Sequence, residues 1–93
     1  MMLTLKYQKS FAKDVKLLKR RGYDLGRLER VVDALSRGEK LPEQNHDHAL
    51  TGNWVGHREC HVQADWLLIY RIDDNELVLI LTRTGTHSDL FKL

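Results

Sequence analysis

The chain has 93 residues, of which 42% are hydrophobic and 30% are charged, and its formal net charge is +2. This composition excludes wholesale disorder, and the length suits one domain with a modest core, which we expect to span residues 1–93. No apolar run approaches the roughly 18–20 residues of a membrane span, so no membrane contact is expected. The single Cys60 and the lack of a secretory signal at Met1–Leu5 predict a reducing, cytoplasmic location.

The first forty residues predict one strand and two helices. Residues 3–7 alternate apolar and polar side chains, the period-2 pattern of a strand with one buried face. Apolar residues at helical spacing predict a helix from a cap at Ser10 to Gly22, and a second from a cap at Asp24 to Gly38. Because so few residues join the two helices, they must pack as an antiparallel hairpin.

The second half of the chain predicts a loop and then strands. Residues 41–53 show no periodicity and are expected to form the loop. After it we expect a strand at 54–62, a tight connection at 63–65, a strand at 66–72, a turn at 73–75, a strand at 76–83, a turn at 84–86 and a short tail at 88–93. The predicted fold class is α+β, with an N-terminal strand and a two-helix hairpin packed on an antiparallel β-sheet.

Charge divides unevenly between the two halves. Residues 1–40 hold eleven Lys or Arg against five Asp or Glu, whereas residues 41–93 hold four against eight. A basic half beside a less basic, histidine-rich half suggests that a polyanion is gripped by one part and handled by the other. The alternative is a lysine-rich helix surface that meets only solvent.

Histidines are the most informative residues, because only their unperturbed pKa allows proton exchange near neutral pH. Four lie within sixteen residues, and the fifth is near the C-terminus, at positions His46, His48, His57, His61 and His87. Asp65 follows His61 by four residues, and Arg83 precedes His87 by four. A small domain with imidazoles, a carboxylate and an arginine is equipped for acid–base chemistry on an anionic substrate.

Three blocks carry a family resemblance, namely Asp47–Trp54, Cys60–Trp66, and Arg83–His87 with Leu90 and Phe91. Together with the first helix at Ser10–Lys16, they resemble the signatures of YafQ-type toxins of the RelE/ParE superfamily. The resemblance implies a RelE-like microbial ribonuclease fold and a ribosome-dependent mRNA endonuclease that inhibits translation. One departure is Ala49, where the family often has proline after the first histidine.

The resemblance also implies a reaction and its partners. Cleavage resembles metal-free ribonuclease chemistry, in which the 2′-hydroxyl of the RNA attacks the scissile phosphate and needs a base, an acid and a cation. No cofactor or metal is therefore expected. The expected partners are a cognate antitoxin, acidic and of the ribbon-helix-helix type, the 70S ribosome and its mRNA, with operator DNA reached only through the antitoxin.

Residue roles follow from the matched positions. The resemblance implies that the catalytic residues are His48, His61, Asp65 and His87, and that the RNA-binding residues are Arg83, Phe91 and Trp66. The basic residues Lys16, Lys19 and Arg20 are expected to contact ribosomal RNA. His87 is the leading general acid, because imidazolium donates well near pH 7 and the preceding turn can present it to a cleft. Asp65 and either His48 or His61 share the base and orienting roles.

A structural role, without any part in catalysis, stays open for each of these residues. His61 and Asp65 can bond each other as a turn brace, His48 can be a solvated loop residue, and Phe91 can plug the core. Zinc is a rival explanation for the histidines, but adjacent strand residues such as Cys60 and His61 face opposite ways. A ParE-like module that inhibits gyrase without nuclease activity is the alternative function, although it has no need for the four catalytic residues.

Overall fold

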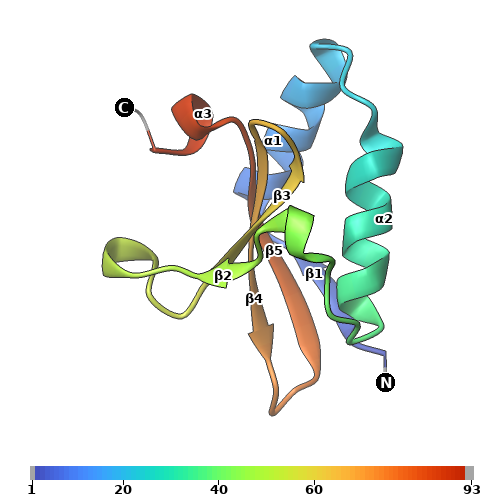
Figure 1. Cartoon of the computed structure of the whole chain (residues 1–93), viewed down its shortest axis with the longest axis vertical. Helices are drawn as coiled ribbons and strands as arrows, with labels where there is room; N and C mark the ends of the chain where they lie inside the picture. The colour runs from blue at the N-terminus through green and yellow to red at the C-terminus, as the bar shows by residue number, and fades with distance from the viewer. Residues whose placement is uncertain (1, 92–93) are drawn as a thin grey trace.

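The computed structural model describes residues 2–91, whose strands form one β-sheet with helices packed on it (Figure 1). In chain order the elements are β1 (Thr4–Tyr7), α1 (Lys9–Arg20), α2 (Leu25–Ser36), the 3-10 turn η1 (Glu43–Asn45), β2 (His48–Ala49), the 3-10 turn η2 (Gly52–Trp54), β3 (Arg58–Gln63), β4 (Trp66–Asp73), β5 (Val78–Gly85) and α3 (His87–Phe91). The predicted α+β class is confirmed. None of the helices within residues 2–91 is long and apolar enough to cross a membrane.

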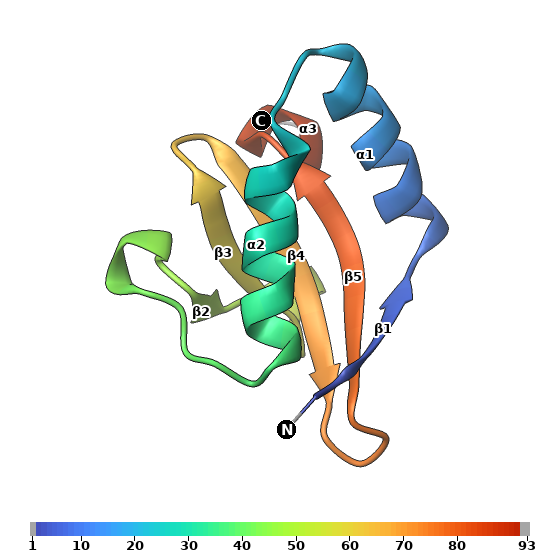
Figure 2. The same cartoon turned by 90° about the vertical axis from the view of Figure 1, so that its right-hand side faces the viewer.

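The sheet is mixed, with strand order β1-β5-β4-β3-β2. Strands β2 to β5 pair antiparallel, as predicted, but β1 runs parallel to β5. Figure 2 shows β1 at one edge of the sheet, beside β5. The antiparallel sheet predicted for the second half of the chain is therefore confirmed, and β1, whose pairing the sequence left open, joins its edge in parallel. The strand predicted at residues 3–7 is present, but its predicted buried face is wrong, because all four residues of β1 are exposed, Leu5 to 37% and Tyr7 to 66%. The direction of pairing depends on where the helices return the chain.

The two helix starts differ in how they are capped. Asp24 caps α2 as predicted, because its Oδ1 accepts a hydrogen bond from the N–H of Gly26 at 3.0 Å. The prediction for α1 is wrong: Gln8 is the residue before the helix, and Ser10 lies inside it. The Ser10 hydroxyl instead donates to the Thr82 carbonyl oxygen at 2.8 Å, so a tertiary contact with β5 has replaced the local cap.

Strand β4 is buried on both faces, which explains its near-continuous apolar sequence. Trp66, Leu68 and Tyr70 point to the main core under α1 and α2, whereas Leu67 and Ile69 join a smaller cluster on the opposite face. Figure 1 shows α2 on one side of the sheet and α3 on the other. The smaller cluster supports the face on which the histidines gather.

Element boundaries differ from prediction where the backbone turns sharply. The strand expected from Trp54 begins at Arg58, because η2 and the positive φ of Gly56 (88°) interrupt extension. The strand expected at 76–83 runs from Val78 to Gly85, after Leu77 adopts a φ of 55°. The expected loop at 41–53 contains η1 and the two-residue β2. The expected tail begins as α3, and its last two residues lie outside the described residues.

Candidate active site

The pairing register places three polar side chains in a row on the sheet face opposite α1 and α2. His48 pairs with Glu59, and Glu59 pairs in turn with Ile69 of the smaller apolar cluster. His61 pairs with Leu67 of the same cluster. Because directly paired residues point to the same side of a sheet, His48, Glu59 and His61 share one face.

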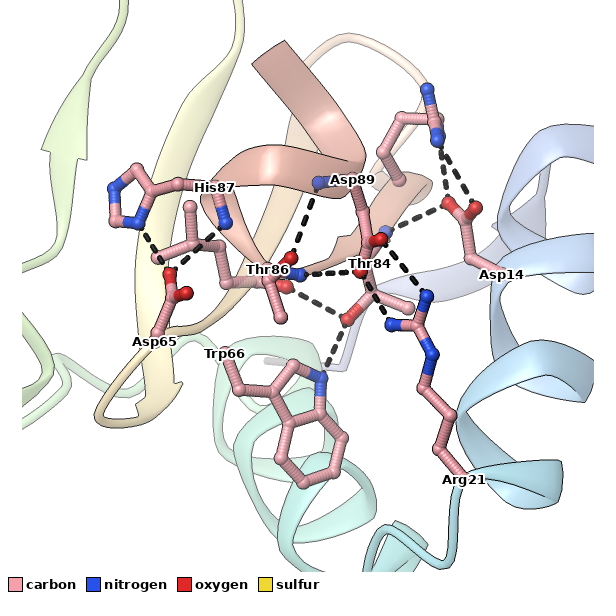
Figure 3. A network of polar contacts seen from close by, with 10 residues as sticks. Asp14, Arg21, Asp65, Trp66, Thr84, Thr86, His87 and Asp89 are labelled. Atoms are coloured by element: carbon pink, nitrogen blue, oxygen red, sulfur yellow. Dashed lines mark hydrogen bonds and ion pairs between the residues drawn. The ribbon is translucent and has the colours of Figure 1, made fainter. Parts of the chain in front are cut away.

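His87 and Asp65 are joined by two hydrogen bonds (Figure 3). The Asp65 Oδ1 accepts a hydrogen bond from the backbone N–H of His87 at 3.0 Å and lies 2.5 Å from the His87 Nδ1. An ionised carboxylate only accepts, so the Nδ1 carries a proton and the Nε2 is left for a substrate. The backbone N–H and the ring of His87 together hold the pKa of the Asp65 carboxyl below its usual value.

His48 and His61 are oriented by backbone carbonyl groups. The Nδ1 of His48 lies 2.7 Å from the carbonyl oxygen of His46, and the Nδ1 of His61 lies 3.2 Å from that of Ala64. Each carbonyl oxygen accepts a hydrogen bond from Nδ1–H, which leaves the Nε2 of both neutral rings able to accept a proton. The possible turn brace between His61 and Asp65 is thus not formed in the structure, since Asp65 bonds His87.

Glu59 is a site residue that the sequence reasoning missed. Its side chain is 7% exposed, and its Oε1 lies 3.6 Å from the Nε2 of His48 and 3.9 Å from the Nε2 of His61. The carboxylate is therefore close to where positive charge develops when either ring takes a proton. Glu59 could have been found from the sequence, because it lies two residues before His61 in a predicted strand and must therefore share its face.

Aromatic rings continue the site in both directions. The His61 ring lies 5.3 Å from the ring of His46 and 6.0 Å from the ring of His87. The His87 ring lies 6.1 Å from Phe91, whose ring is 6.4 Å from Trp54. Phe91 is part-buried against the smaller cluster, so it retains an open surface. These contacts make a continuous series of rings that suits unpaired bases.

Arg83 is held beside the site by α1. Its pairing with Ile69 puts it on the histidine face, and its Nε and Nη2 donate to the two carboxylate oxygens of Asp14 at 2.7 and 3.1 Å. The Asp14 contact raises the pKa of the Arg83 guanidinium. The N–H of Thr84 also donates to Asp14, at 3.0 Å. Asp14 therefore orients the arginine, whose side chain remains 28% exposed.

Asp89 fixes the start of α3, which carries His87. Its Oδ2 accepts from the N–H of Thr86 at 2.9 Å, and its own N–H donates to the Thr86 hydroxyl at 3.1 Å. Arg21, which follows α1, donates to both oxygens of Asp89 at 2.8 and 3.1 Å and holds the pKa of this carboxyl well below its usual range (Figure 3). A Cβ at Gly85 would lie 2.9 Å from Asp89, so glycine is needed at this close approach.

Trp66 is a buried packing residue, so its position does not support the RNA contact that the family resemblance implied. The side chain is 2% exposed, and its Nε1–H donates to the Thr84 hydroxyl at 2.9 Å, which donates in turn to the Leu67 carbonyl oxygen at 2.7 Å. A buried ring cannot stack on a base, so Trp66 supports the strands instead. Cys60 is a core residue as expected, and its burial raises the pKa of its thiol to about 12.

The residues predicted to contact ribosomal RNA belong to α1. Lys16, Lys19 and Arg20 are exposed, and Lys16 borders a groove between α1 and α2 on the opposite side of the sheet. Lys19 and Arg20 directly precede Arg21, which bonds Asp89 beside the site. The structure therefore unites His48, His61, Asp65, His87, Arg83 and Phe91 and leaves Lys16 on the other side of the sheet. Within residues 2–91, no group of three or more His, Cys, Asp or Glu is arranged to hold a metal ion.

Several solved structures that are similar to this chain are bacterial toxins. A metal-bound toxin from Helicobacter pylori is 43% identical and has a TM-score of 0.91, with 97% of this chain and all of that chain covered. The toxin of the Escherichia coli DinJ-YafQ toxin–antitoxin complex is 38% identical, with a TM-score of 0.88 and 98% and 99% coverage. The fold that presents this site is thus that of the toxins of toxin–antitoxin systems.

Sequence comparison narrows the class to one family. Residues 3–92 match the family model described as "Bacterial toxin of type II toxin-antitoxin system, YafQ", and the chain therefore belongs to the YafQ toxin family. The mRNA interferase toxin YafQ of Escherichia coli strain K12 is 40% identical over 88 residues, which cover 94% of each chain. The predicted family is confirmed, and the name of this relative agrees with the predicted class of enzyme, an endoribonuclease.

Proposed function

We propose that this toxin is an mRNA interferase that cuts messages on the ribosome by attack of the RNA's own 2′-hydroxyl. The O2′–P bond forms as the P–O5′ bond breaks, which leaves a 2′,3′-cyclic phosphate on one fragment and a 5′-hydroxyl on the other. The observation that carries the proposal is the Asp65–His87 hydrogen bond beside the His61 ring. This arrangement places two imidazoles, those of His61 and His87, around one position for the substrate. A ParE-like role without cleavage does not require these two imidazoles.

His61 is the general base and His87 the general acid. The Nε2 of His61 takes the proton of the 2′-hydroxyl, and Glu59 at 3.9 Å stabilises the imidazolium that forms. His87 donates its Nε2 proton to the leaving 5′-oxygen while Asp65 holds its Nδ1. His48 shares the Glu59 carboxylate and supports the base side.

The remaining residues bind the substrate. Arg83 faces the charge that builds on the phosphate, and the open surface of Phe91 stacks on a neighbouring base. Lys16, Lys19 and Arg20 of α1 contact ribosomal RNA. The reaction takes place in the cytoplasm, where ribosomes translate. None of these steps uses a metal ion or another cofactor.

An antitoxin is the expected protein partner, since the E. coli relative was solved with DinJ. A groove of about 570 Å³ between β1, α1 and α2 fits such a partner. Most of its lining is apolar, including Tyr7, which is 66% exposed, and Phe11, and its charged lining residues are Lys16, Glu29 and Asp33. The groove therefore fits an apolar segment of a ribbon-helix-helix protein. The acidic character expected of that antitoxin is supported by the exposed basic residues of α1, and operator DNA is reached only through the antitoxin.

The decisive experiment measures cleavage of mRNA on purified translating ribosomes. His87→Ala should cut about 10²- to 10⁴-fold more slowly, because a general acid has been removed. Arg37→Gln, which breaks an exposed ion pair with Glu39 far from the site, is the matched control and should cut at the parent rate. Phenanthroline, which spares the Mg²⁺ that ribosomes need, should have no effect. Full-rate cleavage by His87→Ala, or rescue of chelated protein by zinc, contradicts the mechanism.

A further inference from the structure

A polar hollow lies beside the proposed base and has no part in the chemistry described so far. Its volume is about 450 Å³, and it is formed where η1 meets the end of β3. The polar residues that line it are Gln44, Asn45, His46, His61 and Gln63. Among the described lining residues there is no carboxylate, so a polyanion meets no like charge inside it.

The hollow is built by specific contacts. The Asn45 side chain donates to the carbonyl oxygen of His61 at 2.7 Å and ties η1 to β3. His46 adopts a φ of 47°, a left-handed conformation that is uncommon for a residue other than glycine. The His46 N–H bonds the Glu43 carbonyl oxygen at 2.9 Å, and its ring meets that of His61 edge-on at 5.3 Å. Such conformations persist where the surroundings hold them, as at ligand sites.

The lining offers the two interactions by which proteins read unpaired bases. The exposed His46 ring provides a surface for stacking. Gln44 and Gln63 are exposed and have amides that can both donate and accept, and neither side chain hydrogen-bonds to another residue in the described part of the chain. The two amides can hydrogen-bond to the edge of a nucleobase, and the His46 ring can stack on its face.

The position of the hollow defines which base it can take. The His61 ring lies 5.3 Å from the ring of His46 and 6.0 Å from that of His87, whose ring lies 6.1 Å from Phe91. A phosphate held between His61 and His87 therefore has Phe91 near one neighbouring nucleotide and the hollow near the other. We propose that this hollow is a specificity subsite for the nucleobase next to the cleaved bond, stacked by His46 and read by Gln44 and Gln63. The subsite rests on the proposed RNA cleavage.

The first test maps cleavage on ribosomes that translate a message containing every triplet. His46→Asn removes the ring but tolerates the left-handed backbone, and His46→Phe keeps a ring. A stacked base contributes about 5- to 150-fold in affinity, so His46→Asn and Gln63→Ala should alter relative rates between bases at one position by at least about 5-fold. His46→Phe should alter them less than His46→Asn does. Gln8→Ala, an exposed glutamine outside the hollow, is the matched control.

A second measurement needs no cleavage. A message carries 2′-O-methyl at the cut site and 2-aminopurine at the position that the mapping identifies, or at each flanking position if the parent cuts nothing. The parent, His46→Phe and Gln8→Ala should quench its fluorescence on ribosome complexes, and His46→Asn should not. Equal quenching by all four proteins, or an unchanged cleavage map for His46→Asn and Gln63→Ala, overturns the subsite. A parent that cuts no message contradicts the proposed function instead, and quenching still decides the subsite.

Discussion

At the scale of single residues, Glu59 is the carboxylate that lies close to both His48 and His61. A carboxylate with a 7% exposed side chain lies within 4.0 Å of two imidazole nitrogens, where it can stabilise an imidazolium that forms during the reaction. Water weakens this interaction at His48, whose side chain is 51% exposed. The carboxylate thus favours the charge separation that the base step requires.

We predict that Glu59→Gln lowers kcat by about 10- to 100-fold and leaves KM nearly unchanged, because the amide keeps the shape and removes the charge. Single-turnover cleavage on ribosomes measures the rate. Glu76→Gln, in the exposed turn between β4 and β5, is the matched control for loss of one carboxylate. A Glu59→Gln protein that is as fast as the parent would show that the carboxylate has only a structural role.

At the scale of elements, the ion pair between Arg21 and Asp89 connects the end of α1 with the start of α3. Since Asp89 also bonds Thr86 twice, breaking the pair loosens the segment that presents His87. We predict that Asp89→Asn lowers kcat by about 10-fold or more with KM within about 2-fold, because small misplacements of a catalytic group are costly. Arg37→Gln is again the control. An unchanged kcat would exclude the connection.

The same pair predicts a pH effect on folding. Arg21 lowers the pKa of Asp89 in the folded state, so the stabilisation is complete above the unfolded pKa of about 3.9 and is lost as pH falls through the folded value. The free energy of unfolding of the parent should exceed that of Asp89→Asn at pH 7, and the difference should shrink below about pH 4. Urea unfolding at several pH values measures it, and a constant difference would refute the linkage.

At the scale of the whole molecule, two regions are expected to meet RNA. The histidine face carries the proposed chemistry, and Lys16, Lys19 and Arg20 are exposed on α1. We predict that Lys16, Lys19 and Arg20 changed together to Glu weaken ribosome binding. The slope of log affinity against log salt should become shallower by about 2–3, since each neutralised phosphate contributes about 0.7–0.9. Sedimentation with ribosomes at several salt concentrations gives both values.

The control for this experiment keeps the change in net charge. Arg27, Arg30 and Arg37 of α2 and its end are exposed, and their joint change to Glu removes as many cations from another surface. If both triple variants lose affinity equally, total charge governs binding and the α1 surface has no special part. Unchanged sedimentation of the α1 variant at moderate salt would also contradict the prediction.

The groove between α1 and α2 leads to a prediction about the antitoxin. A small acidic protein encoded beside this gene should copurify with the toxin and restore growth. Tyr7→Glu, which places a charge in the apolar groove, should weaken this complex by at least about 10-fold while mRNA cleavage is unchanged. Affinity measured by calorimetry tests it. A neighbouring gene product that never binds the toxin would contradict the expected partner.

Sequence patterns alone supported much of this description, because they report local burial and residue type. The alternation at residues 3–7, the apolar stripes of α1 and α2 and the apolar run of β4 predicted elements that the structure confirms. The three sequence blocks predicted the family, which the comparisons confirm. Most of the predicted site residues also converge on one face, although their roles remain proposals.

Tertiary structure alone decided how those residues are partnered, because register and chain direction are not encoded in any local period. Asp65 bonds His87, which is 22 residues away, instead of the nearby His61. Sheet pairing buried Trp66 and made β1 parallel to β5. The same pairing brought Glu59 between two histidines. A sequence reveals which side chains are available, whereas the packing of distant segments determines which of them meet.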